Sequence, residues 1–122
     1  MFIPRRKYQQ KAPTKSLTAA TATLTESDSG TVFFLNLITG IAITLPAPTD
    51  GVEYTFIVGT APTSSNGGTG YVITNSAGTS GDNVVGHVLS AGGLAGDVES
   101  TLGGDAVNFV ADSAVLGDRV HL

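Results

Sequence analysis

Short stretches in which large apolar residues alternate with small or polar ones constrain the fold of this chain more than any other feature. Thr31–Asn36 predicts a strand through its β-branched and aromatic residues, and Ile41–Leu45 and Glu53–Val58 alternate with a period of two, which predicts half-buried β-strands. Pro46–Gly51, between the second and the third, cannot continue a strand ladder and predicts a turn. No amphipathic helical pattern competes with these signals. The expected fold is therefore all-β, either a small β-sandwich or a β-barrel.

Further strands are predicted on both sides of this region. Upstream, the alternation of Thr21, Thr23 and Thr25 favours a strand over a helix. Downstream, four segments have strand patterns: Tyr71–Thr74, Val84–Leu89, Ala106–Ala111 and Asp118–Leu122. The predicted core consists of the inward-facing residues of three strands: Phe33, Leu35, Ile41, Ile43, Leu45, Tyr54, Phe56 and Val58. No convincing tandem repeat is visible.

The N-terminal region differs in character from the rest of the chain. Pro4 and Pro13 disfavour regular structure around them, so residues 1–16 are predicted to form an extended N-terminal arm and residues 17–122 a β-domain. Five of the six basic residues lie within the first fifteen positions, and all ten acidic residues follow them. The arm therefore carries +5, and the rest, with one Arg against ten acids, carries −9, which gives the net charge of −4.

Partner binding is the role we predict for this arm, because basic arms commonly bind nucleic acid or acidic protein surfaces. The arm also contains large apolar side chains that suit docking into a neighbour's groove. The candidate binding residues are its charged and large apolar side chains: Phe2, Ile3, Arg5, Arg6, Lys7, Tyr8, Lys11 and Lys15. A solvated or disordered terminus is the alternative.

Residues capable of catalysis or metal binding are few. The chain has no Cys and two His, which excludes a thiolate metal site or a Cys nucleophile. His87 and His121 are interpreted as surface or interface residues, because a metal site would need a third ligand that the spacing does not nominate. No G-x-S-x-G motif is present. We expect neither enzymatic activity nor a cofactor.

Two glycine-rich loops are candidate binding sites. Gly67–Gly70 lacks the Lys of a phosphate-binding loop and no helix follows it, so it is interpreted as a flexible loop. Asp97, Glu99 and Asp105 could chelate a cation, but they lack the regular ligand spacing of a Ca²⁺ loop. No metal site is therefore predicted.

The composition favours contacts with other proteins. Charged residues make up 13% of the chain, about half the ~25% typical of soluble domains, and such a neutral surface is common where subunits pack together. The N-terminus lacks the apolar region of a secretory signal, and no apolar run approaches the ~20 residues of a membrane span. The sequence predicts a soluble protein made in the cytoplasm.

Three consecutive segments, Asp28–Leu35, Gly40–Pro48 and Gly51–Val58, together resemble a pattern found in the head decoration (cement) proteins of tailed bacteriophages. A looser similarity extends to Gly117–Val120. The resemblance implies a structural protein on the outer surface of the virion capsid that binds the major capsid protein and stabilises the shell. It also implies a homotrimer, with a dimer as the alternative. Similar chains often continue with another strand where this one stops at Leu122, so an open strand edge is expected there.

The sequence leaves two alternative functions. A tail-fibre or receptor-binding β-module that recognises cell-surface carbohydrate would show exposed aromatic platforms, whereas the loops contain no Trp and only Tyr71 at a loop margin. Nucleic-acid binding by the arm would have to overcome repulsion between phosphate and the −9 body. Capsid decoration is therefore the preferred prediction.

Overall fold

The computed structural model describes residues 11–75, 87–89 and 106–122 and confirms the all-β fold class. The strands of this part are short: β1 Thr14–Leu17, β2 Thr21–Thr23, β3 Val32–Leu35, β4 Ala42–Thr44, β5 Thr55–Val58, β6 Tyr71–Thr74, β7 His87–Leu89, β8 Ala106–Phe109 and β9 Arg119–His121. Two 3-10 helices lie in the connections: η2 Glu26–Asp28 and η3 Ser64–Asn66.

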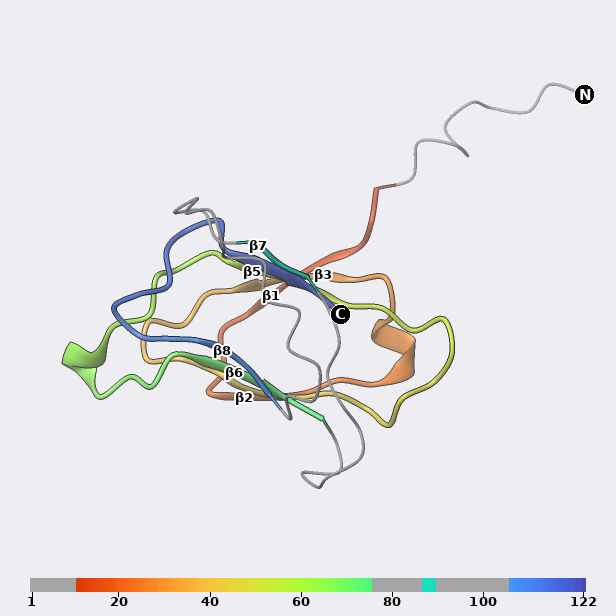
Figure 1. The fold of residues 1–122 in the computed structure, drawn as a ribbon, viewed down its shortest axis with the longest axis horizontal. Coiled ribbons are helices and arrows are strands. Elements are labelled where there is room, and N and C mark those ends of the chain that lie inside the picture. Colours follow the sequence, from red (N-terminus) through yellow and green to blue (C-terminus); the bar gives the residue numbers. More distant parts are fainter. Residues whose placement is uncertain (1–10, 76–86, 90–105) are drawn as a thin grey trace, which may run out of the picture.

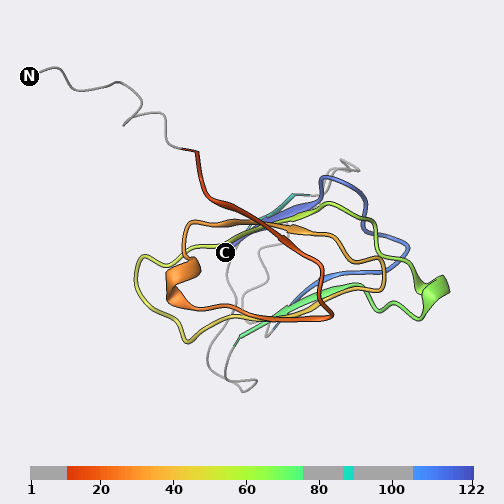
Figure 2. The ribbon, with the colours of Figure 1, turned by 180° about the vertical axis from the view of Figure 1, so that it is seen from behind.

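The strands form two mixed sheets that face each other as layers (Figures 1 and 2). The first sheet has the order β1-β3-β5-β9-β7, and the second has the order β2-β4-β6-β8. Of the two predicted architectures, separate facing sheets make this fold a β-sandwich.

The chain changes sheet at every strand, so that odd-numbered strands build one layer and even-numbered strands the other. As a result β1, β3 and β5 are parallel neighbours, as are β2, β4 and β6. Thr14, Val32 and Thr55, the first residues of β1, β3 and β5, pair in register. One passage of the chain through both sheets, which we call a coil, therefore takes 18 residues the first time and 23 the second. These unequal coil lengths explain why the repeated structure leaves no tandem repeat in the sequence.

The C-terminal strand does not form an open edge, and the sequence-based expectation of one is wrong. β9 lies inside the first sheet, antiparallel to β5 on one side and to β7 on the other. Val120 pairs with Phe56 across one boundary and with Val88 across the other. The outermost strands of the two sheets are instead β1 and β7, and β2 and β8.

Strand β1 begins inside the range that the sequence assigned to the arm. Thr14, Lys15 and Ser16 pair in register with β3. The backbone N–H of Val32 donates to the carbonyl of Pro13 over 2.8 Å, which extends this pairing by one residue. Two prolines in the N-terminal region did not prevent a strand, because Pro13 lies just outside it and contributes only its carbonyl.

The core lies between the sheets and contains the predicted residues. All eight are buried except Leu45, which is half-buried against the core. The rings of Phe33 and Phe56 stack with centroids 5.4 Å apart. The second sheet completes the core with Tyr71 and Ile73, both at 0% exposure. Alternating burial along the short strands follows from the period of two.

Two glycines allow successive coils to stack closely at one end of the sandwich. Gly40 and Gly70 have φ angles of +95° and +90°. A Cβ atom on Gly40 would lie 2.0 Å from the Gly70 carbonyl oxygen, and one on Gly70 would lie 2.1 Å from that of Phe109. No side chain fits between the stacked turns. The loop containing Gly70 was interpreted as flexible, but in the structure Gly70 is buried against neighbouring backbone.

Candidate functional surfaces

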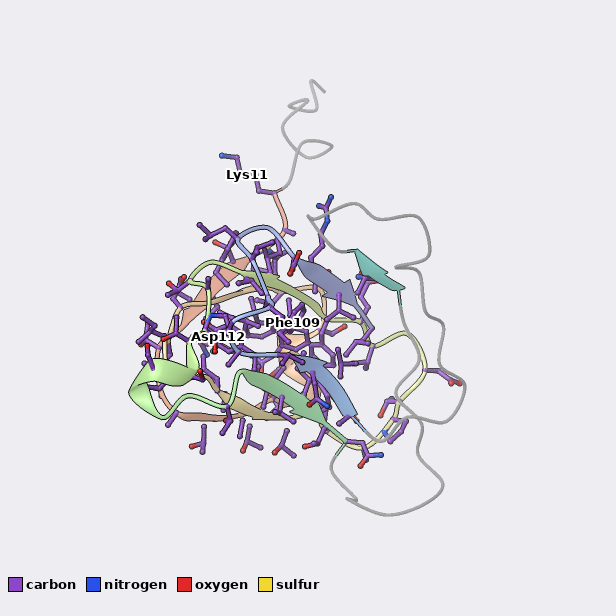
Figure 3. The ribbon with its side chains drawn as sticks, turned by 60° about the vertical axis from the view of Figure 1, so that its left-hand side comes forward. Lys11, Phe109 and Asp112 are labelled. Atoms are coloured by element: carbon purple, nitrogen blue, oxygen red, sulfur yellow. The ribbon has the colours of Figure 1, made fainter. Side chains whose placement is uncertain are left out.

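Six of the eight candidate arm residues lie outside the described residues: Phe2, Ile3, Arg5, Arg6, Lys7 and Tyr8. The structure places the other two apart. Lys11 is exposed, and its side chain extends away from the sheets (Figure 3). Lys15 is also exposed but belongs to β1. The basic segment therefore meets the sandwich at the first strand of an outer edge.

The chain enters the sandwich at an end that carries several carboxylates, which we name the acidic end: Glu26, Asp28, Asp50 and Glu53. Hydrogen bonds join its connections. The Gly30 N–H donates to the Glu53 carbonyl over 2.8 Å, and the Thr49 hydroxyl donates to the Glu26 carboxylate over 2.6 Å. Because β1 and β3 are parallel, Pro13 lies at this same end. Basic and acidic regions of the chain thus meet here.

His121 lies on the outer side of the first sheet at the acidic end. Its Nδ1 is 2.8 Å from the Thr55 hydroxyl, and its Nε2 is 3.5 Å from the Glu53 carboxylate. His87 is its register partner on β7. Among the side chains that the structure describes, no group of three His, Cys, Asp or Glu could hold a metal ion. The candidate cation ligands in the loop 90–105 lie outside the described residues.

The outer side of the second sheet is uncharged, and we name it the threonine face. Its residues form two rows in register across the four strands: Thr21, Ala42, Val72 and Asn108, and Thr23, Thr44, Thr74 and Ala106. Neighbouring strands place these short side chains about 4.8 Å apart. A face of this kind has no charges to desolvate when another protein covers it.

The exposed large apolar side chains of the described part lie in connections at the end opposite to the acidic end. We name this set the apolar end: Ile38, Val110, Val115 and Leu116. Backbone hydrogen bonds hold its connections together. The Thr63 N–H donates to the Ile38 carbonyl, and the Gly117 N–H donates to that of Val58, each over 3.0 Å. Leu116 is the most exposed of the set, at 64%. Exposed apolar side chains gathered at one end of a molecule are suited to contact with other proteins.

The exposed carboxylate of Asp112 links two connections at the apolar end. Asp112 accepts hydrogen bonds from the backbone N–H of Ser64, at 3.1 Å, and from the Ser64 hydroxyl. It thereby caps η3 from a different connection (Figure 3). These bonds to Ser64 lower the pKa of the Asp112 carboxyl below its ordinary value of 3.8. Asp112 also has a φ of +64°, which aspartate tolerates better than most residues.

Aromatic side chains offer no exposed platform in the part of the chain that the structure describes. Phe33, Tyr54, Phe56, Tyr71 and Phe109 are all buried, and the remaining ring there is half-buried. Flat exposed rings are what a carbohydrate site of this kind would present. Within the same residues, no helix combines the length and apolar character needed to cross a bilayer.

The fold and these surfaces define a small all-β protein whose described surface offers contact areas. No family model matches the chain, and neither a curated protein nor a solved structure matches it. The arm, the threonine face and the apolar end are therefore the features that bear on function.

Proposed function

We propose that this chain is a structural protein that decorates the outer surface of a tailed-phage head. In this proposal the β-sandwich assembles as a homotrimer, and the N-terminal arm binds the major capsid protein. Stabilisation of the shell arises from added contacts between neighbouring capsid subunits and requires no chemical step.

The observation that carries the proposal is the separation between the basic segment and the body of the β-sandwich. Pro13 marks the boundary, because its carbonyl bonds to β3 while Lys11 already extends from the body. The buried core residues that the structure describes all lie beyond Pro13, from Leu17 onward. A protein organised in this way can bind a partner through the segment without disturbing its own packing.

Two surfaces of the sandwich support self-association. The threonine face is uncharged, and the apolar end presents four large apolar side chains. If another subunit covered either surface, Asp112 would be the charged side chain close to the contact. Subunit packing over such areas is consistent with an assembly in which each copy keeps its arm free for the capsid.

The test is a deletion of residues 1–11 in the full chain, assayed for binding to undecorated heads of the parent phage. Ala12 and Pro13 are retained because the Pro13 carbonyl bonds to Val32. We expect the truncated chain to keep its fold and oligomeric state but to lose most of its occupancy on heads. Unchanged occupancy would contradict the proposed role of the arm.

Two matched variants separate the contributions of charge and apolar anchors. One replaces Arg5, Arg6 and Lys7 by Gln, and the other replaces Phe2 and Ile3 by Ala. If charge dominates, wild-type binding weakens as salt reduces the Debye length from ~10 Å at 0.1 M to ~3 Å at 1 M, and the Gln variant loses this dependence. If the anchors dominate, the Ala variant loses more occupancy than salt removes. Electron microscopy of decorated heads then locates the bound copies.

A further inference from the structure

Lys15 occupies the side of β1 that faces the core. Its register partner is Phe33, and Phe33 pairs in turn with Phe56; both rings are fully buried between the sheets. Residues paired across neighbouring strands share one face of a sheet. Leu17, two positions further along β1, is also buried, at 8% exposure. Lys15 thus interrupts a core-facing row, yet it is itself exposed.

The exposure follows from the position of β1 at the edge of its sheet. On its free side no strand of the described part pairs with β1, and the same is true of β2 in the second sheet. Both strands belong to the first coil, separated only by residues 18–20. This coil therefore offers two neighbouring edges. Unpaired strand edges recruit strands from other molecules unless something prevents it.

A second copy of the chain is the partner that fits these edges, because it brings an identical β1. In an antiparallel pair of β1 strands, the core continues from one copy to the next only if core-facing residues meet core-facing residues. That condition places Lys15 opposite either Lys15 or Leu17 of the second copy. Each lysine would then be covered by the joined cores, and burial of unpaired, like charges is strongly unfavourable.

We propose that Lys15 prevents the open first coil from pairing edge to edge with a second copy of this chain. The edges of β1 and β2 form a self-association surface that the lysine charge keeps unpaired. This role is independent of capsid binding and of the trimer proposed above, and it separates Lys15 from the other basic residues of the N-terminal region.

The test compares the full chain with three variants by sedimentation velocity over a range of concentrations. Lys15→Val replaces the charge with a good strand former, and we expect species larger than the wild-type oligomer at a concentration at least about 10-fold lower. Thr14→Val makes a similar apolar change on the outer face of the same strand. Lys15→Glu keeps a charge at the core-facing position. Both should behave as wild type.

Several outcomes would overturn the proposal. If a folded Lys15→Val variant sediments like wild type, the lysine charge is not the barrier to association. Equal association of Thr14→Val shows that apolar surface alone drives assembly, and association of Lys15→Glu shows that a charge there does not block it. Circular dichroism verifies folding of each variant. Should Lys15→Val not fold, Lys15→Gln decides in its place: association beyond wild type supports the proposal, and wild-type behaviour contradicts it.

Discussion

The hydroxyl groups of two tyrosines, Tyr71 and Tyr54, form hydrogen bonds with the backbone of the connections between strands. The Tyr71 side chain extends from β6 to the connection that follows β3. Its hydroxyl accepts a hydrogen bond from the Leu37 N–H at 3.2 Å. The same oxygen lies 2.7 Å from the carbonyl oxygen of Thr60 and 3.1 Å from that of Leu35. Burial raises the pKa of this phenol above 10.0, and the bond from Leu37 opposes that shift. At the acidic end, the Tyr54 hydroxyl donates to the Thr25 carbonyl over 2.9 Å.

We predict that Tyr71→Phe lowers the free energy of unfolding by about 1–3 kcal/mol, because the partly buried Leu37 N–H and Thr60 carbonyl lose their hydrogen bonds to the phenol. Chemical denaturation of both proteins measures the difference. Tyr54→Phe is the matched control, since it removes one hydrogen bond next to exposed residues and should cost less. Equal losses in the two variants would contradict the assigned role of Tyr71.

Asp112 provides a prediction about pH. Its pKa is lowered in the folded state by the bonds to Ser64, so its contribution to stability is present above the unfolded pKa of 3.8 and is lost as pH falls through the folded pKa. Asp112→Asn removes this titration and still tolerates the positive φ. The melting temperatures of the two proteins should differ most near neutral pH and converge in acid. A difference that stays constant with pH would contradict this.

At the scale of elements, most of the short strands divide their few residues between the core and a surface. β4 shows this division clearly: Ile43 is 1% exposed, while its neighbour Ala42 is exposed on the threonine face. Ile43 pairs in register with Ile73 on β6. With so few residues per strand, an error of one position in the register would expose the apolar side of the strand.

Ile43→Asp should abolish folding or nearly so, because an unpaired buried charge costs several kcal/mol against a total stability of about 5–15 kcal/mol. Ala42→Asp places the same charge one residue away on the outer face and should leave the melting temperature close to that of wild type. Thermal denaturation followed by circular dichroism compares the two. Wild-type melting of Ile43→Asp would show that the face assignment is wrong.

At the scale of the whole molecule, surfaces of different character lie on different sides. The acidic end receives the basic N-terminal segment, the apolar end carries the exposed large apolar side chains, and the threonine face is neutral. In the proposed function, these areas divide between contacts with copies of the chain and contacts with the partner.

We predict that the purified full chain, of 12.3 kDa, forms a homotrimer through its uncharged surfaces. Sedimentation equilibrium gives the mass directly. Leu116→Asp, which places a charge at the most exposed apolar position, should weaken the trimer if the apolar end is part of the contact, whereas Ser113→Asp in the same connection should matter less. A monomer at micromolar concentration with the arm intact would count against the trimer.

The sequence by itself determined the class of fold, most strand positions and the core face, because the period of two and the turn residues are local signals. It could not determine strand pairing. Parallel coils, the interior position of β9 and the contact between Ser64 and Asp112 join residues far apart in sequence. The position of Lys15 shows the same limit: composition grouped it with a basic arm, and only its pairing with Phe33 placed it on a sheet. Coils of unequal length left no period from which that pairing could be inferred, so tertiary packing alone decided it.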